Sequence, residues 1–93
     1  MTDEKQAGNQ GPLPNINFAT FIFSLNSSAL VQLGMMEDPM TGEKSENLPL
    51  AKQTIDLLSM LEEKTKGNLD TDEAAMLKNI LYDLRIHYVK ATG

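Results

Sequence analysis

The sequence has no cysteine and no tryptophan, and aromatic residues make up only 5% of its 93 residues. Without a thiol, the chain can form neither a disulfide framework nor a thiolate metal site. Basic residues are also scarce, with 8 Lys and Arg against 13 Asp and Glu and a formal charge of −5. Domains that bind nucleic acid normally carry a basic patch, so the charge argues against a nucleic-acid partner.

The length of 93 residues and the apolar content of 41% allow one small domain. A chain of this size buries only about 60–65% of the surface that its unfolded form exposes, so a core built by one chain alone is marginal. Residues 1–15 are rich in Gly, Pro, Asn and Gln and lack apolar periodicity. They are predicted to form a disordered tail before a single helical domain at residues 16–91. No basic segment followed by an apolar run begins the chain, so we predict a cytoplasmic protein.

The most informative segment runs from Ile16 to Met36 and contains no ionisable side chain. It is predicted to form a helix over residues 17–36, with Asn15 or Asn17 as N-cap. A surface helix normally carries charged residues opposite its apolar stripe, and this one carries none. Its apolar residues form two faces about 100–140° apart. The first face holds Phe18, Phe21, Ile22, Leu25, Ala29, Leu33 and Met36, and the second holds Ala19, Phe23, Leu30 and Gly34.

Two further helices are predicted at residues 48–66 and 71–90. Asn47 can cap the first of them, and Asp70 with Glu73 has the spacing of an acidic capping box for the second. The link between the two helices is short, which predicts an antiparallel hairpin. No strand-like alternation is present. The expected fold is therefore all-α, with one uncharged apolar helix followed by an antiparallel helical hairpin and completed by oligomerisation.

Four stretches carry a resemblance to a known family. The first contains Phe18-x-x-Phe21-Ile22, Ser24-Leu25 and Ser28-Ala29-Leu30-Val31-x-Leu33-Gly34, and the second is Asp38-Pro39-x-Thr41-Gly42. The third begins Asn47-Leu48-x-x-Ala51-Lys52-Gln53-Thr54 and ends Lys64-Thr65-Lys66-Gly67-Asn68-Leu69, and the fourth is Leu81-Tyr82-Asp83-Leu84-Arg85-x-x-Tyr88-Val89. In these stretches the chain resembles the small bacterial proteins of the domain-of-unknown-function family numbered 1844. The resemblance implies a bacterial, cytoplasmic, helical protein with no assigned activity, and it supplies no catalytic or binding residues.

The strongest catalytic candidate is His87, the only histidine, which follows Asp83 by one helical turn. A carboxylate in that position can orient an imidazole for general-base chemistry. The sequence offers no cysteine, no G-x-S-x-G turn and no second histidine to complete a nucleophilic or zinc site. We therefore expect a structural pair and no enzyme. The alternative is a ligand-binding or enzymatic subunit that uses His87, Asp83 and Tyr88 near a pocket between chains.

The sequence also argues against a metal and a cofactor. Glu37, Asp38, Glu43 and Glu46 lie in a predicted loop over residues 37–47, but the calcium pattern D-x-[DN]-x-[DN]-G is absent. These residues are expected to form a solvated acidic loop. The stretch Lys64-Thr65-Lys66-Gly67-Asn68 lacks the spacing of a phosphate-binding loop and follows a helix C-terminus, where the helix dipole repels anions.

Residues 18–36 are long enough to be considered as a membrane span. Polar residues occupy the middle of this segment, and neither flank has a cluster of Lys or Arg. The polar residues are Ser24, Asn26, Ser27, Ser28 and Gln32. Membrane contact is therefore not expected. Peripheral attachment through Phe18, Phe21 and Phe23 is kept as an alternative, although the acidic surroundings repel anionic lipid.

The remaining interpretation of the uncharged helix is a protein contact. Two neighbouring helices cover about half of its circumference, so a second chain is expected to cover the rest. The chain is therefore predicted to be a structural, regulatory or adaptor-type module, either a homo-oligomer or bound to another protein. The candidate interface consists of Phe18, Phe21, Phe23, Ser24, Ser28, Leu30, Tyr82, Ile86 and Val89. A compact monomer whose first helix kinks at Gly34 is the alternative.

Overall fold

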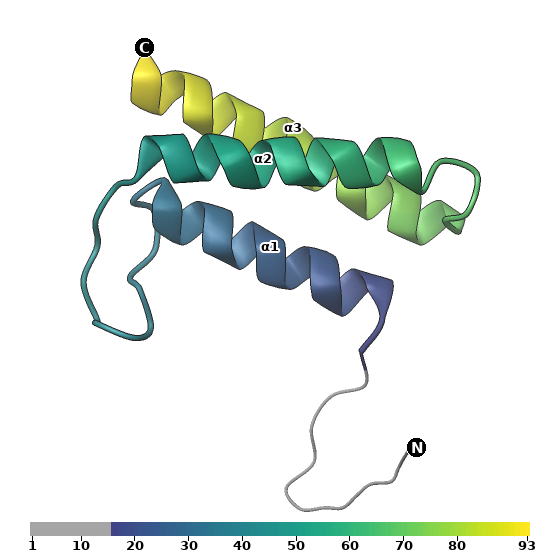
Figure 1. Ribbon diagram of the computed structural model, residues 1–93, viewed down its shortest axis with the longest axis horizontal. Coiled ribbons are helices and arrows are strands. Elements are labelled where there is room, and N and C mark those ends of the chain that lie inside the picture. The colour runs from purple at the N-terminus through teal and green to yellow at the C-terminus, as the bar shows by residue number, and fades with distance from the viewer. Residues whose placement is uncertain (1–15) are drawn as a thin grey trace, which may run out of the picture.

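The computed structural model describes residues 16–93 and contains three α-helices over that range. They are α1 (Phe18–Gln32), α2 (Leu48–Lys64) and α3 (Thr71–Thr92), shown in Figure 1. The only strand-like pairing in the described range is an isolated bridge, so the predicted all-α class is confirmed. The predicted disordered tail lies outside the described residues.

Each helix begins at a side-chain cap that the sequence predicts. Asn17, Asn47 and Asp70 each accept a hydrogen bond from the backbone N–H three residues ahead, at 2.8, 3.1 and 2.8 Å. Glu73 completes the capping box, because its carboxylate accepts from the Asp70 backbone N–H at 3.1 Å. The caps satisfy backbone donors that have no partner inside their helix. Asn17, not Asn15, is the cap of α1.

α1 ends at Gln32, four residues before the predicted end at Met36. Gly34 has a φ of +78°, and the turn carries the two hydrogen bonds of a Schellman motif. The backbone N–H of Gly34 donates to the Val31 carbonyl at 3.0 Å, and the N–H of Met35 donates to the Leu30 carbonyl at 2.9 Å. The sequence predicts an end that lies too far along the chain, because the apolar pattern continues beyond Gly34, where the backbone changes direction.

The other two helices differ less from the prediction. α2 ends at Lys64 rather than at residue 66, and α3 continues to Thr92 rather than to residue 90. The turn after α2 contains Gly67, whose φ is +86°. The Thr65 hydroxyl donates to the Leu61 carbonyl at 2.6 Å and supports the end of α2.

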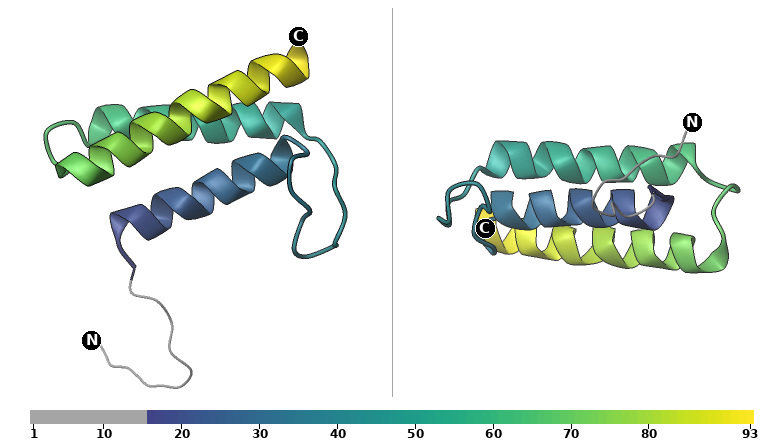
Figure 2. Two further views of the ribbon diagram at one scale, coloured as in Figure 1. Left: turned by 180° about the vertical axis from the view of Figure 1, so that it is seen from behind. Right: turned by 90° about the horizontal axis from the view of Figure 1, so that it is seen from below.

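α2 and α3 form the predicted antiparallel hairpin, and α1 packs alongside both of them (Figures 1 and 2). α1 runs antiparallel to α2 and in the same direction as α3 (Figure 1). All three helices therefore contribute to one core. Its buried apolar residues are Ile22, Ala29, Leu33, Ala51, Ile55, Leu58, Leu77, Leu81 and Leu84.

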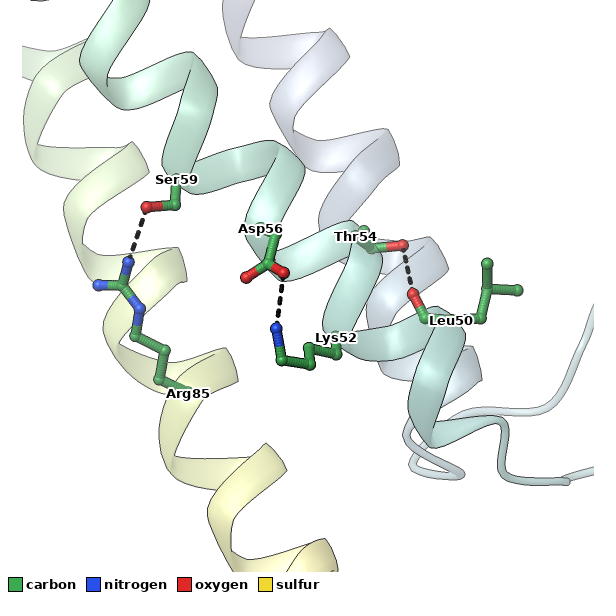
Figure 3. A network of polar contacts seen from close by, with 6 residues as sticks. All are labelled: Leu50, Lys52, Thr54, Asp56, Ser59 and Arg85. Atoms are coloured by element: carbon green, nitrogen blue, oxygen red, sulfur yellow. Dashed lines mark hydrogen bonds and ion pairs between the residues drawn. The ribbon is translucent and has the colours of Figure 1, made fainter.

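Polar contacts fix the C-terminal end of α1 against the start of α2. The Thr54 hydroxyl is buried, donates to Gln32 Oε1 at 2.7 Å and lies 3.1 Å from the Leu50 carbonyl oxygen (Figure 3). The Asn47 backbone N–H donates to the Gln32 carbonyl at 2.8 Å. One residue closer to the loop, Leu33 forms a backbone bridge with Glu46. These contacts hold together the two ends of the long loop between α1 and α2.

We predict that Gly34→Ala lowers the free energy of unfolding more than Gly42→Ala does. Both glycines have a positive φ, which disfavours alanine by about 1–2 kcal/mol. An added Cβ at Gly34 would also lie 2.9 Å from Glu46 Cγ, whereas nothing lies within 4 Å of one at Gly42. Denaturant unfolding measures both losses. Equal losses would contradict the prediction that the Glu46 contact matters.

We also predict that Thr54→Val and Gln32→Ala are coupled by about 0.5–1.5 kcal/mol in a double-mutant cycle. Valine keeps the volume of Thr54 but removes the hydroxyl that joins α2 to α1. The free energies of unfolding of the single and double variants measure the coupling. Thr92→Val is a suitable control partner for Gln32→Ala, because Thr92 bonds only to carbonyls of its own helix in the described structure. Additive effects of Thr54→Val and Gln32→Ala would contradict the prediction.

Candidate functional site

One side of α1 forms part of the core. Ile22 and Ala29 are fully buried, and Phe18, Leu25 and Leu30 pack against the core while remaining partly exposed. The hairpin therefore covers most of the first apolar face that the sequence predicts. It leaves Phe21 at the edge of that face with 43% of its surface exposed.

The opposite side of α1 is open to solvent in this single chain. A row of small and β-branched residues runs along its middle, and larger apolar residues occupy both of its edges. Helical geometry places Phe21 and Ser28 along one edge and Phe23 and Leu30 along the other. We call this surface the outer face of α1. It consists of Thr20, Phe21, Phe23, Ser24, Ser27, Ser28, Leu30 and Val31.

The outer face of α1 is apolar at its edges and free of charge throughout. Phe23 is 54% exposed, and the helix has no acidic residue in its first turn and no basic residue in its last. The Ser24 hydroxyl donates to the Phe21 carbonyl at 2.7 Å. Because this hydroxyl already has an acceptor within the helix, removing water from the centre of the face leaves no Ser24 donor unpaired.

α2 also exposes apolar residues on the side that lies against α1. The bond from Thr54 to Gln32 identifies the side of α2 that lies against α1. Leu50 and Leu57 precede and follow Thr54 by about one turn, so they share that side, and they are 40% and 37% exposed. Neither leucine belongs to the interface predicted from the sequence. The broad apolar pattern of residues 50–61 was the available signal.

The candidate residues on α3 form a separate stripe. A shallow depression of about 350 Å³ between the starts of α1 and α3 identifies the side of α3 that faces α1. Its lining consists of Asn17, Ala19, Asp70, Asp72, Glu73 and Met76. Tyr82 and Val89 lie about 120–150° around α3 from that side, and Ile86 lies about 90° from it. These residues therefore do not extend the outer face of α1, and their part in an interface stays a prediction.

The structure does not bring His87, Asp83 and Tyr88 together by a side-chain hydrogen bond within the described residues. No hydrogen bond joins Asp83 to His87 among the bonds of the described residues, and Tyr88 packs against the core. None of the three residues lines either of the two depressions described here. A site that these residues would form between chains stays a prediction.

The larger depression lies at the turn between α2 and α3 and has a volume of about 620 Å³. It is open to solvent, and its lining combines apolar residues with charges of both signs. The lining consists of Ser59, Glu62, Glu63, Thr65, Lys66, Gly67, Leu69, Ala74, Leu77 and Lys78. Arg85 donates to the Ser59 hydroxyl at 3.1 Å and joins the two helices at one side of it (Figure 3). The mixture of charges gives no preference for an anion or a cation.

Residues 38–42 of the acidic loop form a hydrogen-bonded turn. Asp38 Oδ1 accepts from the Met40 N–H at 2.8 Å, and the Asp38 carbonyl accepts from the Gly42 N–H at 2.7 Å. Asp38 therefore stabilises the turn. Within residues 16–93, no group of three or more His, Asp or Glu side chains is arranged to hold a metal ion. On α2, a 2.8 Å hydrogen bond from the exposed Lys52 to Asp56 raises the pKa of that lysine (Figure 3).

The membrane-span alternative fails on length. α1 has 15 residues, and none of the helices within residues 16–93 combines the length and the hydropathy that crossing a bilayer requires.

Comparisons with known proteins give one match. The model of a domain of unknown function (DUF1844) matches residues 15–90. No curated protein and no solved structure matches the chain. The matched range contains all three helices except the last two residues of α3, and it includes the whole outer face of α1. The chain therefore belongs to this domain-of-unknown-function family, as the resemblance in its sequence indicates.

Proposed function

We propose that this chain is a protein-interaction module of structural, regulatory or adaptor type, and that another protein chain binds the outer face of α1. The observation that carries the proposal is the combination of two half-exposed phenylalanines with a helix that has no charge. Phe21 and Phe23 are 43% and 54% exposed on opposite edges of this face. Large apolar side chains left exposed on a face without charge are typical of interaction sites.

The free energy gained by covering the two phenylalanines is too small for a stable complex by itself. A phenylalanine side chain presents about 200 Å², so the exposed parts of Phe21 and Phe23 amount to about 200 Å² together. Covering that area contributes about 5 kcal/mol at about 25 cal/mol per Å². Association itself costs at least about 4 kcal/mol. A stable complex therefore needs the neighbouring apolar edge as well, which Leu50 and Leu57 supply.

The proposal assigns neither catalysis nor a cofactor to the chain and places it in the cytoplasm. Its single histidine has no carboxylate bonded to it within the described residues, and the net charge of −5 disfavours nucleic acid. Interaction surfaces are enriched in aromatic residues and methionine at their centre and depleted of charge. The outer face of α1 shares the depletion of charge, and its two phenylalanines stand at its edges, beside a centre of small residues.

We predict that Phe23→Glu reduces the apparent size of the protein in a native extract, whereas Tyr82→Glu does not. Tyr82 is a matched control because it is also aromatic and 65% exposed, but it lies on the separate stripe of α3. Size-exclusion chromatography of extracts is the measurement. The unmodified chain and Tyr82→Glu should elute well above the 10.3 kDa of one chain, and Phe23→Glu should elute near it.

Circular dichroism of the purified variants checks that both retain the helical fold. The proposed function is wrong if the unmodified chain already elutes as a single chain, or if Phe23→Glu leaves its elution unchanged.

A further inference from the structure

We infer that the partner on the outer face of α1 is a second copy of this chain, with the two α1 helices packed antiparallel about a two-fold axis. This inference rests on the proposed function and adds the identity and the orientation of the partner. It is carried by the spacing of small residues and by the distribution of charge.

The centre of the face has the spacing of a helix–helix seam. Thr20, Ser24, Ser27 and Val31 follow one another at intervals of four, three and four residues. Intervals of three and four residues place side chains on one face of a helix. Paired helices contact each other through residues with this spacing. Small side chains on a seam let two backbones approach closely. In an antiparallel pair, Thr20 lies opposite the partner's Val31, and Ser24 lies opposite the partner's Ser27.

The edges of the face are complementary in the same arrangement. An antiparallel two-fold axis sets each edge against the same edge of the other copy. Phe21 then lies opposite the partner's Ser28, so a large side chain meets a small one. On the other edge, Phe23 lies opposite the partner's Leu30, so two apolar side chains meet.

The distribution of charge favours a second copy and an antiparallel orientation. The outer face of α1 has no charge with which to recognise an acidic or a basic partner. Two chains of net charge −5 can meet at this face without local repulsion. The loop that follows α1 holds Glu37, Asp38, Glu43 and Glu46 against Lys44, which gives −3. Parallel α1 helices would place these two loops side by side, whereas antiparallel helices place them at opposite ends.

The area of the face limits the strength of such a contact. α1 has 15 residues and is therefore about 22 Å long, so one helix pair covers less than the roughly 800 Å² per partner of a standard interface. A two-fold contact covers four phenylalanines instead of two. It also brings the edge of α2 that carries Leu50 and Leu57 toward the same edge of the other copy. We therefore expect an association that depends on protein concentration.

Sedimentation equilibrium of the purified full chain over a wide range of concentrations tests the identity of the partner. We expect a monomer–dimer equilibrium whose dissociation constant rises at least tenfold in Ser27→Glu. Ser27 is exposed, so its substitution leaves the packing of the single chain intact. Ser45→Glu is the matched control: it adds the same charge at an exposed serine of the loop and should leave the constant within twofold.

Disulfide trapping tests the orientation, because the chain has no cysteine of its own. In an antiparallel pair the two copies of position 20 are about 16 Å apart along the axis, too far for a disulfide. Thr20→Cys mixed with Val31→Cys should therefore form a mixed disulfide dimer, and Thr20→Cys alone should not. Rapid dimer formation by Thr20→Cys alone would overturn the antiparallel arrangement.

Two other outcomes separate this inference from the proposed function. If the purified chain is a monomer at every concentration while Phe23→Glu still reduces its size in a native extract, the partner is a different protein and only this inference fails. The second outcome is co-sedimentation of the purified monomer with phosphatidylcholine vesicles. If Phe23→Glu abolishes that co-sedimentation but leaves the elution volume of the chain in the native extract unchanged, the face binds lipid. Both proposals are then wrong.

Discussion

The packing of one charge-free helix on a helical hairpin is the constraint on which the structure depends. α1 must bury apolar residues, and the hairpin lies on one side of it. Ala29 of α1 and Ala51 of α2 are both fully buried, and such small side chains let neighbouring helices lie close together. Ile22 of α1 is also fully buried. The hairpin covers only one side of α1, so the same packing that completes the core also leaves the outer face of α1 open.

Polar contacts fix the rotation of α1 about its axis against the hairpin. Apolar packing is non-directional and tolerates small rotations of a helix. The hydrogen bond between Thr54 and Gln32 and the backbone bond from Asn47 to Gln32 are directional, and both act at the same end of α1. These two bonds therefore fix which residues point outward at that end of α1. The outer face is therefore a defined surface, with its two phenylalanines held on opposite edges of a row of small residues.

Local features of the fold were predictable from the sequence, and tertiary features were not. The caps at Asn47 and Asp70 depend on side chains within three residues of the backbone that they bond, so spacing alone identifies them. The end of α1 was misplaced because apolar residues continue past Gly34, where the backbone reverses. The helical wheel of the first helix predicted that Phe23 lies on a different face from the main apolar stripe. The separation of Tyr82 from α1 could not be predicted in this way. A helical wheel shows which residues share a face, but not which neighbouring helix covers that face.

A 2.8 Å hydrogen bond and a backbone bridge join the two ends of the loop between α1 and α2. These contacts, and not the rest of the loop, fix the register of α1 against α2. Closing a longer loop adds little free energy, since the entropic term grows only with the logarithm of its length. The exposed tip at Met40 can therefore accept inserted residues, such as an epitope or a dye-labelling sequence, while the bundle keeps its geometry.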